Sequence, residues 1–257
     1  MAYALITGAS GGLGLALAHE FAAHKHDLVL VARRRDMLEQ IAADLRQLGV
    51  AVEIIVADLS QPGACADICS TLQTRDLQIE WLVNNAGVGS NGTFWELDTQ
   101  KELDQITINV TAVVELTRRL LPAMVARKRG CVLNIGSSAG FQAGPFMATY
   151  YASKAFVLSF TEAIASELRG TGVTATVSCP GPIATNFGAT SGNGTSRLFA
   201  QGGVAQADDV ARQAYAAMRA GRGTIIHTVK LRVGLALAKL VPRSVATSVA
   251  RKLNLPA

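Results

Sequence analysis

A tyrosine and a lysine four positions apart, Tyr150 and Lys154, have the residue types best suited to acid–base chemistry in this sequence. They fall in a helical pattern at residues 150–169, and side chains at i and i+4 share one helix face. A free phenol has a pKa near ~10 and exchanges protons poorly at neutral pH, but a neighbouring ammonium group stabilises the phenolate and lowers that pKa. The pair could therefore exchange a proton with a carbonyl or alcohol oxygen. Tyr151 is three residues from Lys154, also within helical reach, so the spacing alone leaves the choice of tyrosine open.

A glycine-rich turn, Thr7-Gly8-Ala9-Ser10-Gly11-Gly12-Leu13-Gly14, joins the first strand-like run to a helical pattern. Glycines let the backbone turn tightly and approach a pyrophosphate, whose charge is then stabilised by the N–H groups and positive end of the helix. The spacing is Gly-x3-Gly-x-Gly rather than the commoner G-x-G-x-x-G, and a purely structural tight turn would use the same glycines. Its place after a leading strand favours a dinucleotide-binding turn.

The second strand-like run ends in Ala32-Arg33-Arg34-Arg35. Sites selective for NAD carry an acidic residue here, which accepts hydrogen bonds from the adenosine ribose. Alanine followed by guanidinium groups instead suits a 2′-phosphate, although arginines also occur at the start of solvent-facing helices. We expect Arg33 and Arg34 to contact the phosphate of NADP(H) and Arg35 to belong to the helix.

Short aliphatic runs alternate along the chain with longer segments of helical spacing. Strands are expected at Tyr3–Thr7, Asp27–Ala32, Val52–Ala57, Trp81–Asn84, Cys131–Ile135, Val173–Cys179 and Thr224–His227. Helices are expected at residues 12–23, 35–48, 63–74, 99–127, 150–169 and 207–220. This order predicts an α/β fold, a Rossmann-type doubly wound sheet of about seven parallel strands with helices on both faces. Residues 1–257 are expected to form one domain.

The motifs, in this order and at this spacing, resemble the short-chain dehydrogenase/reductase family in its single-domain form of about 250 residues. The resemblance runs from Tyr3 to about Gly223. Its segments are Thr7–Gly14, Asp58-Leu59, Asn84-Asn85-Ala86-Gly87, Asn109, Ser137, the Tyr150-x3-Lys154 pair and Pro180–Thr185. One departure is Gly11, where many NADP-preferring members carry a basic residue, so phosphate selectivity rests on Arg33 and Arg34.

The resemblance implies a catalytic set of Asn109, Ser137, Tyr150 and Lys154. Tyr150 would give a proton to a carbonyl oxygen as hydride arrives from the nicotinamide, whose positive charge when oxidised also lowers the tyrosine pKa. Ser137 would hydrogen-bond the substrate oxygen, Lys154 the nicotinamide ribose, and Asn109 a water on the proton path to solvent.

The family interval of 13 residues from serine to tyrosine fits both Ser137 with Tyr150 and Ser138 with Tyr151. Only Tyr150 also keeps the Tyr-x3-Lys interval, so we assign Ser137 and Tyr150 and expect Tyr151 to pack or lie at an interface. The implied cofactor-binding set is Gly8, Ser10, Gly12, Leu13, Gly14, Arg33, Arg34, Asp58, Leu59, Asn85, Ala86, Gly87, Tyr150, Lys154, Pro180, Gly181, Ile183 and Thr185.

The loops that follow the strands carry apolar residues, and ligands in this fold bind outside the carboxyl ends of the strands. These residues are Phe94, Trp95, Phe141, Phe146, Met147 and Phe187. They favour a small hydrophobic ketone, aldehyde or secondary alcohol as substrate, although ordinary core or lid packing would use the same residues. Residues 182–206, rich in small polar residues, are predicted to form a substrate lid loop.

We expect carbonyl reduction, because cytosolic NADPH is held mostly reduced. The alternative is a catalytically silent, cofactor-binding regulatory or scaffold protein. The resemblance also implies a homodimer or homotetramer, formed through the helices at 99–127 and 150–169.

Charge is unevenly distributed. The net charge is +5 overall, yet the chain after Asp209 carries nine basic residues and no acidic one. Residues 230–257 form a basic extension with a short helix at Leu231–Val241, a break at Pro242, and a second helix with apolar residues at Val245, Val249 and Leu253. We expect this extension to pack on the body, cover the cleft or join subunits, with peripheral contact to an anionic membrane as the alternative. No nucleic-acid partner is predicted.

The composition, 49% hydrophobic and 17% charged, excludes a disordered chain. No apolar run approaches the ~20 residues needed to cross a bilayer, and Met1 leads directly into a strand, so a cytoplasmic location is expected. Cys65 and Cys69 are expected to be buried or half-buried thiols, His24 and His26 to lie in an exposed loop, and no metal site is predicted.

Overall fold

The computed structural model describes residues 2–194, 196, 203–238 and 240–255. Within them, seven strands form one parallel sheet with the order β3-β2-β1-β4-β5-β6-β7. The strands are β1 (Ala2–Thr7), β2 (Asp27–Ala32), β3 (Val52–Val56), β4 (Gln78–Asn84), β5 (Gly130–Ile135), β6 (Val173–Cys179) and β7 (Thr224–Ile226). The predicted doubly wound sheet is confirmed.

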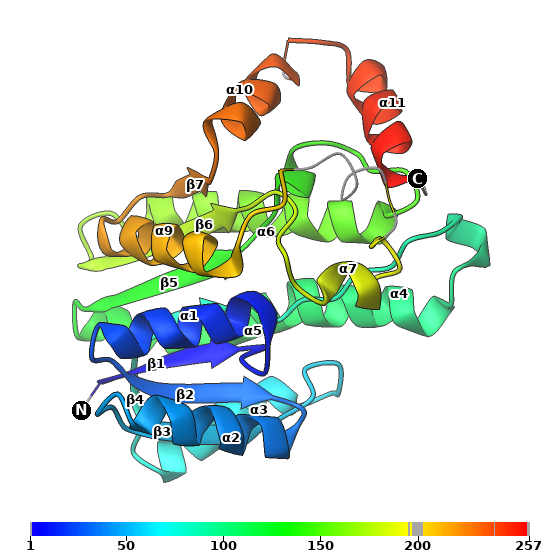
Figure 1. Cartoon of the computed structure of the whole chain (residues 1–257). Helices are drawn as coiled ribbons and strands as arrows, with labels where there is room; N and C mark the ends of the chain where they lie inside the picture. The colour runs from blue at the N-terminus through cyan, green and yellow to red at the C-terminus, as the bar shows by residue number, and fades with distance from the viewer. Residues whose placement is uncertain (1, 195, 197–202, 239, 256–257) are drawn as a thin grey trace.

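Helices cover both faces of the sheet, with α1, α2 and α9 on one face and α3, α5 and α6 on the other (Figure 1). The described helices are α1 (Gly12–Ala23), α2 (Arg35–Arg46), α3 (Ala64–Thr74), α4 (Thr99–Ile106), α5 (Ala112–Ala126), α6 (Ala148–Glu167), α7 (Phe187–Thr190), α9 (Ala207–Arg219), α10 (Val229–Ala238) and α11 (Arg243–Asn254). Short helical turns lie at η1 (Phe94–Glu96), η2 (Thr107–Thr111) and η3 (Ser138–Phe141).

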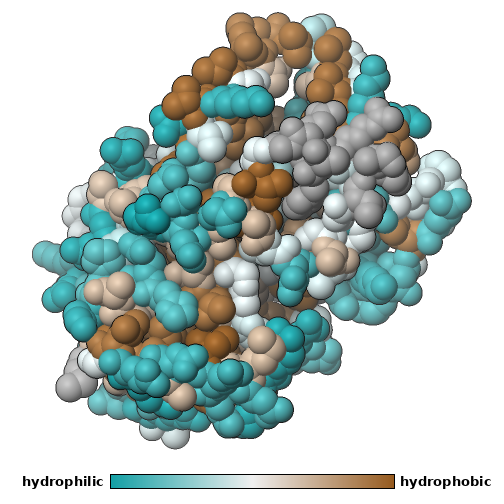
Figure 2. All heavy atoms as spheres, in the orientation of Figure 1, coloured by the Kyte–Doolittle hydropathy of each residue, from teal (hydrophilic) through white to brown (hydrophobic). Residues whose placement is uncertain are grey.

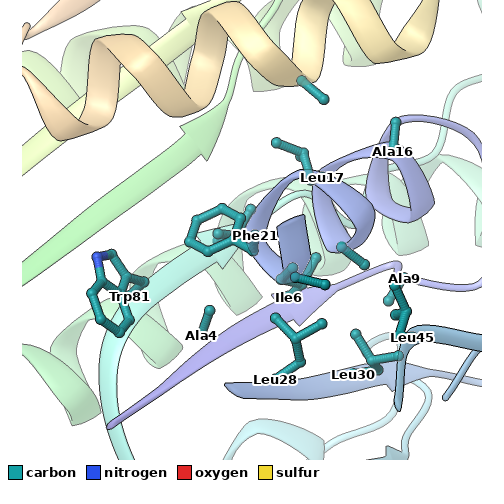
Figure 3. Packing of buried hydrophobic residues seen from close by; sticks show 14 of the residues in the cluster. Ala4, Ile6, Ala9, Ala16, Leu17, Phe21, Leu28, Leu30, Leu45 and Trp81 are labelled. Atoms are coloured by element: carbon teal, nitrogen blue, oxygen red, sulfur yellow. The ribbon is translucent and has the colours of Figure 1, made fainter. Parts of the chain in front are cut away.

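The central strands have apolar side chains on both faces. In β1, Ala4 and Ile6 belong to the core beneath α1, while Leu5 belongs to the core on the opposite face. Successive side chains of a strand point to opposite faces, so a continuous apolar run supplies both layers. Figure 3 shows Leu17 and Phe21 of α1 above Ile6, and burying each such large side chain stabilises the fold by about 1.5–3 kcal/mol.

The sheet order changes direction between β1 and β4. The chain adds β2 and β3 on one side of β1, and then crosses to place β4 on its other side. The connections therefore diverge at the carboxyl ends of β1 and β4, which is where doubly wound folds bind their ligands. Thr7 ends β1 and Asn85 follows β4 at this point.

The helix predicted at residues 99–127 is not continuous. It consists of α4, the π-helical turn η2 and α5. The π turn contains Asn109, whose amide hydrogen-bonds the N–H and C=O of Val88 at 2.9 Å each. Such π turns are frequent at functional sites.

The prediction that His26 lies in an exposed loop is wrong, because its side chain is half-buried. Its Nε2 lies 2.8 Å from the Tyr215 hydroxyl, and its ring centroid lies 4.1 Å from that of Trp81. Burial lowers the pKa of His26 to about 4. His24 is exposed, as expected.

Cys65 is buried and Cys69 half-buried, as predicted. Across the described ranges, no three His, Cys, Asp or Glu side chains are grouped as a metal would require. None of the described helices is both long and apolar enough to span a membrane.

The predicted lid loop, residues 182–206, lies partly outside the described residues, which omit 195 and 197–202 and hence Phe199. Its described part contains α7 and a parallel bridge between Ile183 and Ala205.

The basic extension contains the two predicted helices, α10 and α11, which stand at the top of Figure 1, above β7 and α6. Lys239 lies outside the described residues. Asn254, near the end of α11, is fully buried and donates from Nδ2 to the Pro145 carbonyl at 2.9 Å.

Candidate active site

The glycine turn between β1 and α1 has the geometry of an anion site. Gly8 and Gly12 have φ angles of 66° and 54°, in the left-handed region that favours glycine. The N-terminus of α1 has no side-chain cap and no acidic residue in its first turn, which leaves its N–H groups available to an anion. Nothing lies within 4 Å of the position that a Cβ on Gly11 would take. The turn therefore fits a pyrophosphate.

Two further contacts hold the turn in place. A Cβ on Gly14 would lie 2.2 Å from the Gly8 carbonyl oxygen, so only glycine fits there. Asn85 Nδ2 donates to the Thr7 carbonyl at 2.8 Å, and the N–H groups of Asn85 and Ala86 each donate to Thr7 Oγ1 at 3.0 Å. The ends of β1 and β4 are thus fixed to each other at the crevice.

Arg33 and Arg34 lie beside the glycine turn. Arg34 Nη2 lies 3.5 Å from the Ser10 carbonyl oxygen, and Arg33 Nη1 lies 4.0 Å from Asp58 Oδ2. Both guanidinium groups are exposed. Leu59, which follows Asp58 and also belongs to the predicted cofactor-binding set, is buried. Arg35 instead pairs with Glu39 along α2, at 3.6 Å. Arg35 therefore belongs to α2, as predicted.

Ser137, Tyr150 and Lys154 converge at the carboxyl end of β5. Ser137 lies two residues after β5, close enough to the Tyr150 side chain to lower the pKa of that phenol. Lys154, only 5% exposed, donates from Nζ to the Ile135 carbonyl at 2.8 Å. Lys154 Nζ lies 5.8 Å from the centroid of the Tyr150 ring.

The pKa values of this pair differ from the prediction. Burial raises the pKa of Tyr150 to about 12, and the Ser137 side chain acts in the opposite direction. Burial also lowers the pKa of Lys154 to about 8. Removal from water favours the neutral form of each group, so the predicted lowering of the Tyr150 pKa by Lys154 is wrong for this chain by itself.

Asn109 links the segment after β4 to α6. Besides its two bonds to Val88, its Nδ2 donates to Ser153 Oγ at 3.1 Å, and Ser153 Oγ donates to the Tyr150 carbonyl at 2.7 Å. A Cβ on Gly87 would lie 3.4 Å from both Asn109 Oδ1 and Lys154 Nζ. Asn109 and Lys154 therefore meet beside Gly87, and Ser153 joins Asn109 to the backbone of Tyr150.

The segment after β6 closes the site opposite the glycine turn. A Cβ on Gly12 would lie 3.2 Å from the Thr185 side chain, so the turn and the predicted cofactor-binding segment Pro180–Thr185 face each other. Pro180 accepts a hydrogen bond from the Ser138 N–H at 2.8 Å, and a Cβ on Gly181 would lie 3.6 Å from Leu231 of α10.

The six apolar residues predicted near the substrate are not equivalent. The Phe187 ring lies over Tyr150, with the centroids 5.3 Å apart, and Phe141 and Phe146 are half-buried. Met147 is buried in the core with Tyr151 and Ala250. Phe94 and Trp95 are exposed.

Tyr151 points away from the site. Its hydroxyl donates to Asn254 Oδ1 of α11 at 3.1 Å, so it packs, as expected. Ser153 and Thr7 were not predicted as site residues. Thr7 stood in a quoted motif, but its bonds to Asn85 and Ala86 depend on the β1–β4 pairing, which the local sequence does not show.

Comparison with known proteins identifies the family. The sequence profile described as short chain dehydrogenase matches residues 2–195. The granaticin polyketide synthase putative ketoacyl reductase 1 of Streptomyces violaceoruber is 38% identical over 184 residues, which are 71% of this chain and 68% of that protein. In three further curated relatives, the match covers 52–62% of the relative's own length.

Solved structures agree over almost the whole chain. A short-chain dehydrogenase from Sphingobium yanoikuyae in complex with NADPH has a TM-score of 0.83 at 33% identity, covering 93% of this chain and 94% of that one. A family member from Burkholderia phymatum in complex with NAD also has a TM-score of 0.83, at 25% identity, covering 100% and 97%. With its profile match, its fold and these relatives in agreement, the chain belongs to the short-chain dehydrogenase family of oxidoreductases.

Proposed function

We propose that this protein is an NADP(H)-dependent reductase that converts a hydrophobic ketone or aldehyde to its alcohol, with Tyr150 as the proton donor. The observation that carries the proposal is the meeting of Ser137, Tyr150 and Lys154 beside the crevice of the glycine turn. A phenol with a pKa of about 12 is protonated at neutral pH, so Tyr150 carries the proton that carbonyl reduction consumes.

The choice of NADP(H) rests on charge. A 2′-phosphate at the end of β2 would meet two exposed guanidinium groups, Arg33 and Arg34, and no acidic residue stands where NAD-selective sites place one. Guanidinium groups form strong, charge-assisted hydrogen bonds to phosphate. Known structures in the family hold NADPH in one case and NAD in another. The proposal of NADP(H) therefore rests on Arg33 and Arg34 of this chain.

The bound cofactor would supply hydride to the carbonyl carbon. Ser137 would hydrogen-bond the carbonyl oxygen, where negative charge develops as the C=O π bond breaks. Tyr150 would transfer its phenolic proton to that oxygen and complete the alcohol. Lys154 would contact the nicotinamide ribose and stabilise the phenolate that remains. We further propose that Asn109 holds a water on the path that returns a proton to Tyr150.

The substrate class follows from the surroundings of Tyr150. Phe187 packs on its ring, and the half-buried Phe141 and Phe146 lie on the segment that joins Ser137 to α6. Aromatic side chains favour an apolar substituent next to the carbonyl group. The similarity to a putative ketoacyl reductase supports a 3-oxoacyl compound within this class.

The test is oxidation of NADPH and of NADH by the purified protein with a panel of ketones, aldehydes and 3-oxoacyl thioesters. We expect turnover with NADPH, and Arg33→Ala with Arg34→Ala should raise the KM for NADPH far more than that for NADH. Arg35→Ala is the matched control and should change neither. Turnover with NADH alone would refute the choice of cofactor. Cofactor binding without turnover on any compound would instead support the silent binding protein.

A further inference from the structure

The helices α10 and α11, together with residues 240–242 between them, form a surface that we call the C-terminal arch. It stands apart from the sheet at the top of Figure 1, and hydrophobic residues cover much of it in Figure 2. Seven of its large apolar side chains are exposed, namely Val229, Val233, Leu237, Leu240, Val241, Val245 and Val249. Contiguous exposed apolar surface of this kind marks an interaction site.

In α10 the exposed apolar residues form one stripe. Val229, Val233 and Leu237 recur every four residues and so share a helix face. Leu235 is buried about 200° around the helix from Val233, at ~100° per residue. Lys230 and Arg232 flank the stripe, about 60° and 100° from Val233 on opposite sides. An apolar stripe bordered by cations is typical of helices that lie in a lipid interface.

α11 repeats this division between a docked face and a free one. Ala250 and Asn254 are fully buried and hold the helix on the body, through Tyr151 and the Pro145 carbonyl. Val245 and Val249 form a separate exposed stripe on another side of the helix. The docked face is thus already occupied, and the apolar stripe remains open to a partner.

The charge of the arch indicates the chemistry of that partner. Its described basic residues are Lys230, Arg232, Arg243, Arg251 and Lys252. In the described part of the chain none of these five forms an ion pair, and no acidic residue follows Asp209. Arg232 donates to the Ile226 carbonyl, and Arg251 lies over the Phe146 ring, so both keep their charge unneutralised.

Two partners are compatible with an apolar surface, a lipid bilayer and a second copy of the chain. A two-fold contact of arch with arch would bring like charges together, because such an interface uses the same patch on both copies. Exposed apolar residues that suit subunit contacts lie elsewhere, at Ile106 of α4 and Phe156 of α6. An anionic bilayer satisfies both the apolar stripes and the cations.

We propose that the C-terminal arch docks this protein on an anionic lipid surface. The stripes of α10 and α11 lie at the boundary between headgroups and acyl chains, and the lysines and arginines beside them contact lipid phosphates. The proposal does not depend on the reaction catalysed.

The test is co-sedimentation of the full chain with vesicles of phosphatidylcholine alone or of phosphatidylcholine mixed with phosphatidylglycerol. We expect binding only to the mixed vesicles. Leu237→Asp should abolish it, whereas the matched control Leu48→Asp, at an exposed leucine after α2, should not. Lys230→Gln and Lys252→Gln should each weaken binding about fivefold, and Lys101→Gln on α4 should have no effect.

Oxidation of NADPH and sedimentation velocity of the same variants distinguish binding from misfolding. Equal binding to both vesicle types, or none to either, would overturn the proposal. A smaller oligomer for Leu237→Asp, without vesicle binding by the unmutated chain, would make the arch a contact between copies instead.

Discussion

At the scale of single residues, burial sets the direction of the pKa shifts of Tyr150 and Lys154. Their spacing predicts a shared helix face, and they do lie together, with Lys154 Nζ 5.8 Å from the ring centroid. The pKa of Tyr150 is nevertheless raised to about 12, and that of Lys154 is lowered to about 8. The Lys154 amine donates a hydrogen bond to the Ile135 carbonyl. Tyr150 therefore holds its proton at neutral pH, and carbonyl reduction requires that proton.

The first prediction concerns pH. Lys154 is charged below its pKa of about 8 and becomes neutral above it, while Tyr150 stays protonated until about 12. The kcat/KM for NADPH, which reports the free enzyme, should therefore fall from about pH 8 upward. A profile that stays level to pH 10 would show that the charge of Lys154 is not needed.

At the scale of elements, the sequence predicts most of what is local. The strands at Asp27–Ala32 and Val173–Cys179 agree at both ends, because continuous aliphatic runs bounded by polar residues are a strong signal. β4 begins at Gln78, three residues before the predicted start, since Gln78 and Glu80 interrupt its apolar pattern. The π turn around Asn109 depends on hydrogen bonds to Val88 and Ser153, which no local pattern shows.

The features of the candidate site also differ in whether they are local in sequence. The glycine turn and the Tyr-x3-Lys pair are local in sequence, and their positions were predicted. The packing of Phe187 on Tyr150 and the bond from Tyr151 to Asn254 join distant segments. From the sequence, Tyr151 could be separated from Tyr150 only because it lacks the Tyr-x3-Lys interval to Lys154.

The second prediction tests the glycine turn as an element. Gly14→Ala would place a methyl group 2.2 Å from the Gly8 carbonyl and 2.5 Å from Asn85 Nδ2. The overpacking should lower the free energy of unfolding by about 1–3 kcal/mol and weaken NADPH binding. Gly11→Ala is the control for stability, because its methyl group meets no described protein atom within 4 Å. Urea unfolding and NADPH titration measure both effects, and equal stability of the two variants would contradict the described packing.

At the scale of the whole molecule, two partly or fully buried histidines link stability to acid. Burial lowers the pKa values of His26 and His227 to about 4. His227 is 7% exposed, and its Nε2 lies 2.8 Å from Ser178 Oγ. Its Nδ1 is buried and has no hydrogen-bond partner among the described residues. Each ring is neutral in the fold at pH values where the unfolded chain protonates it.

The third prediction follows from the sign of this shift. Between about pH 6.5 and 4 the unfolded state binds more protons than the folded state, so the free energy of unfolding should fall as the pH decreases. His227 alone should account for about 3 kcal/mol of this loss. Urea unfolding at a series of pH values should show a shallower slope for His227→Gln. An unchanged slope would mean that His227 is not desolvated as described.

The central claim is that Tyr150 gives the proton in carbonyl reduction, and the adjacent tyrosine provides its control. The most direct measurement compares kcat for NADPH-dependent reduction in Tyr150→Phe and Tyr151→Phe, with NADPH affinity measured for both. Loss of the proton donor should lower kcat about 10²–10⁴-fold in Tyr150→Phe, at unchanged NADPH affinity, while Tyr151→Phe loses only its bond to Asn254 and keeps its turnover. Turnover retained by Tyr150→Phe, or lost only in Tyr151→Phe, would contradict this account.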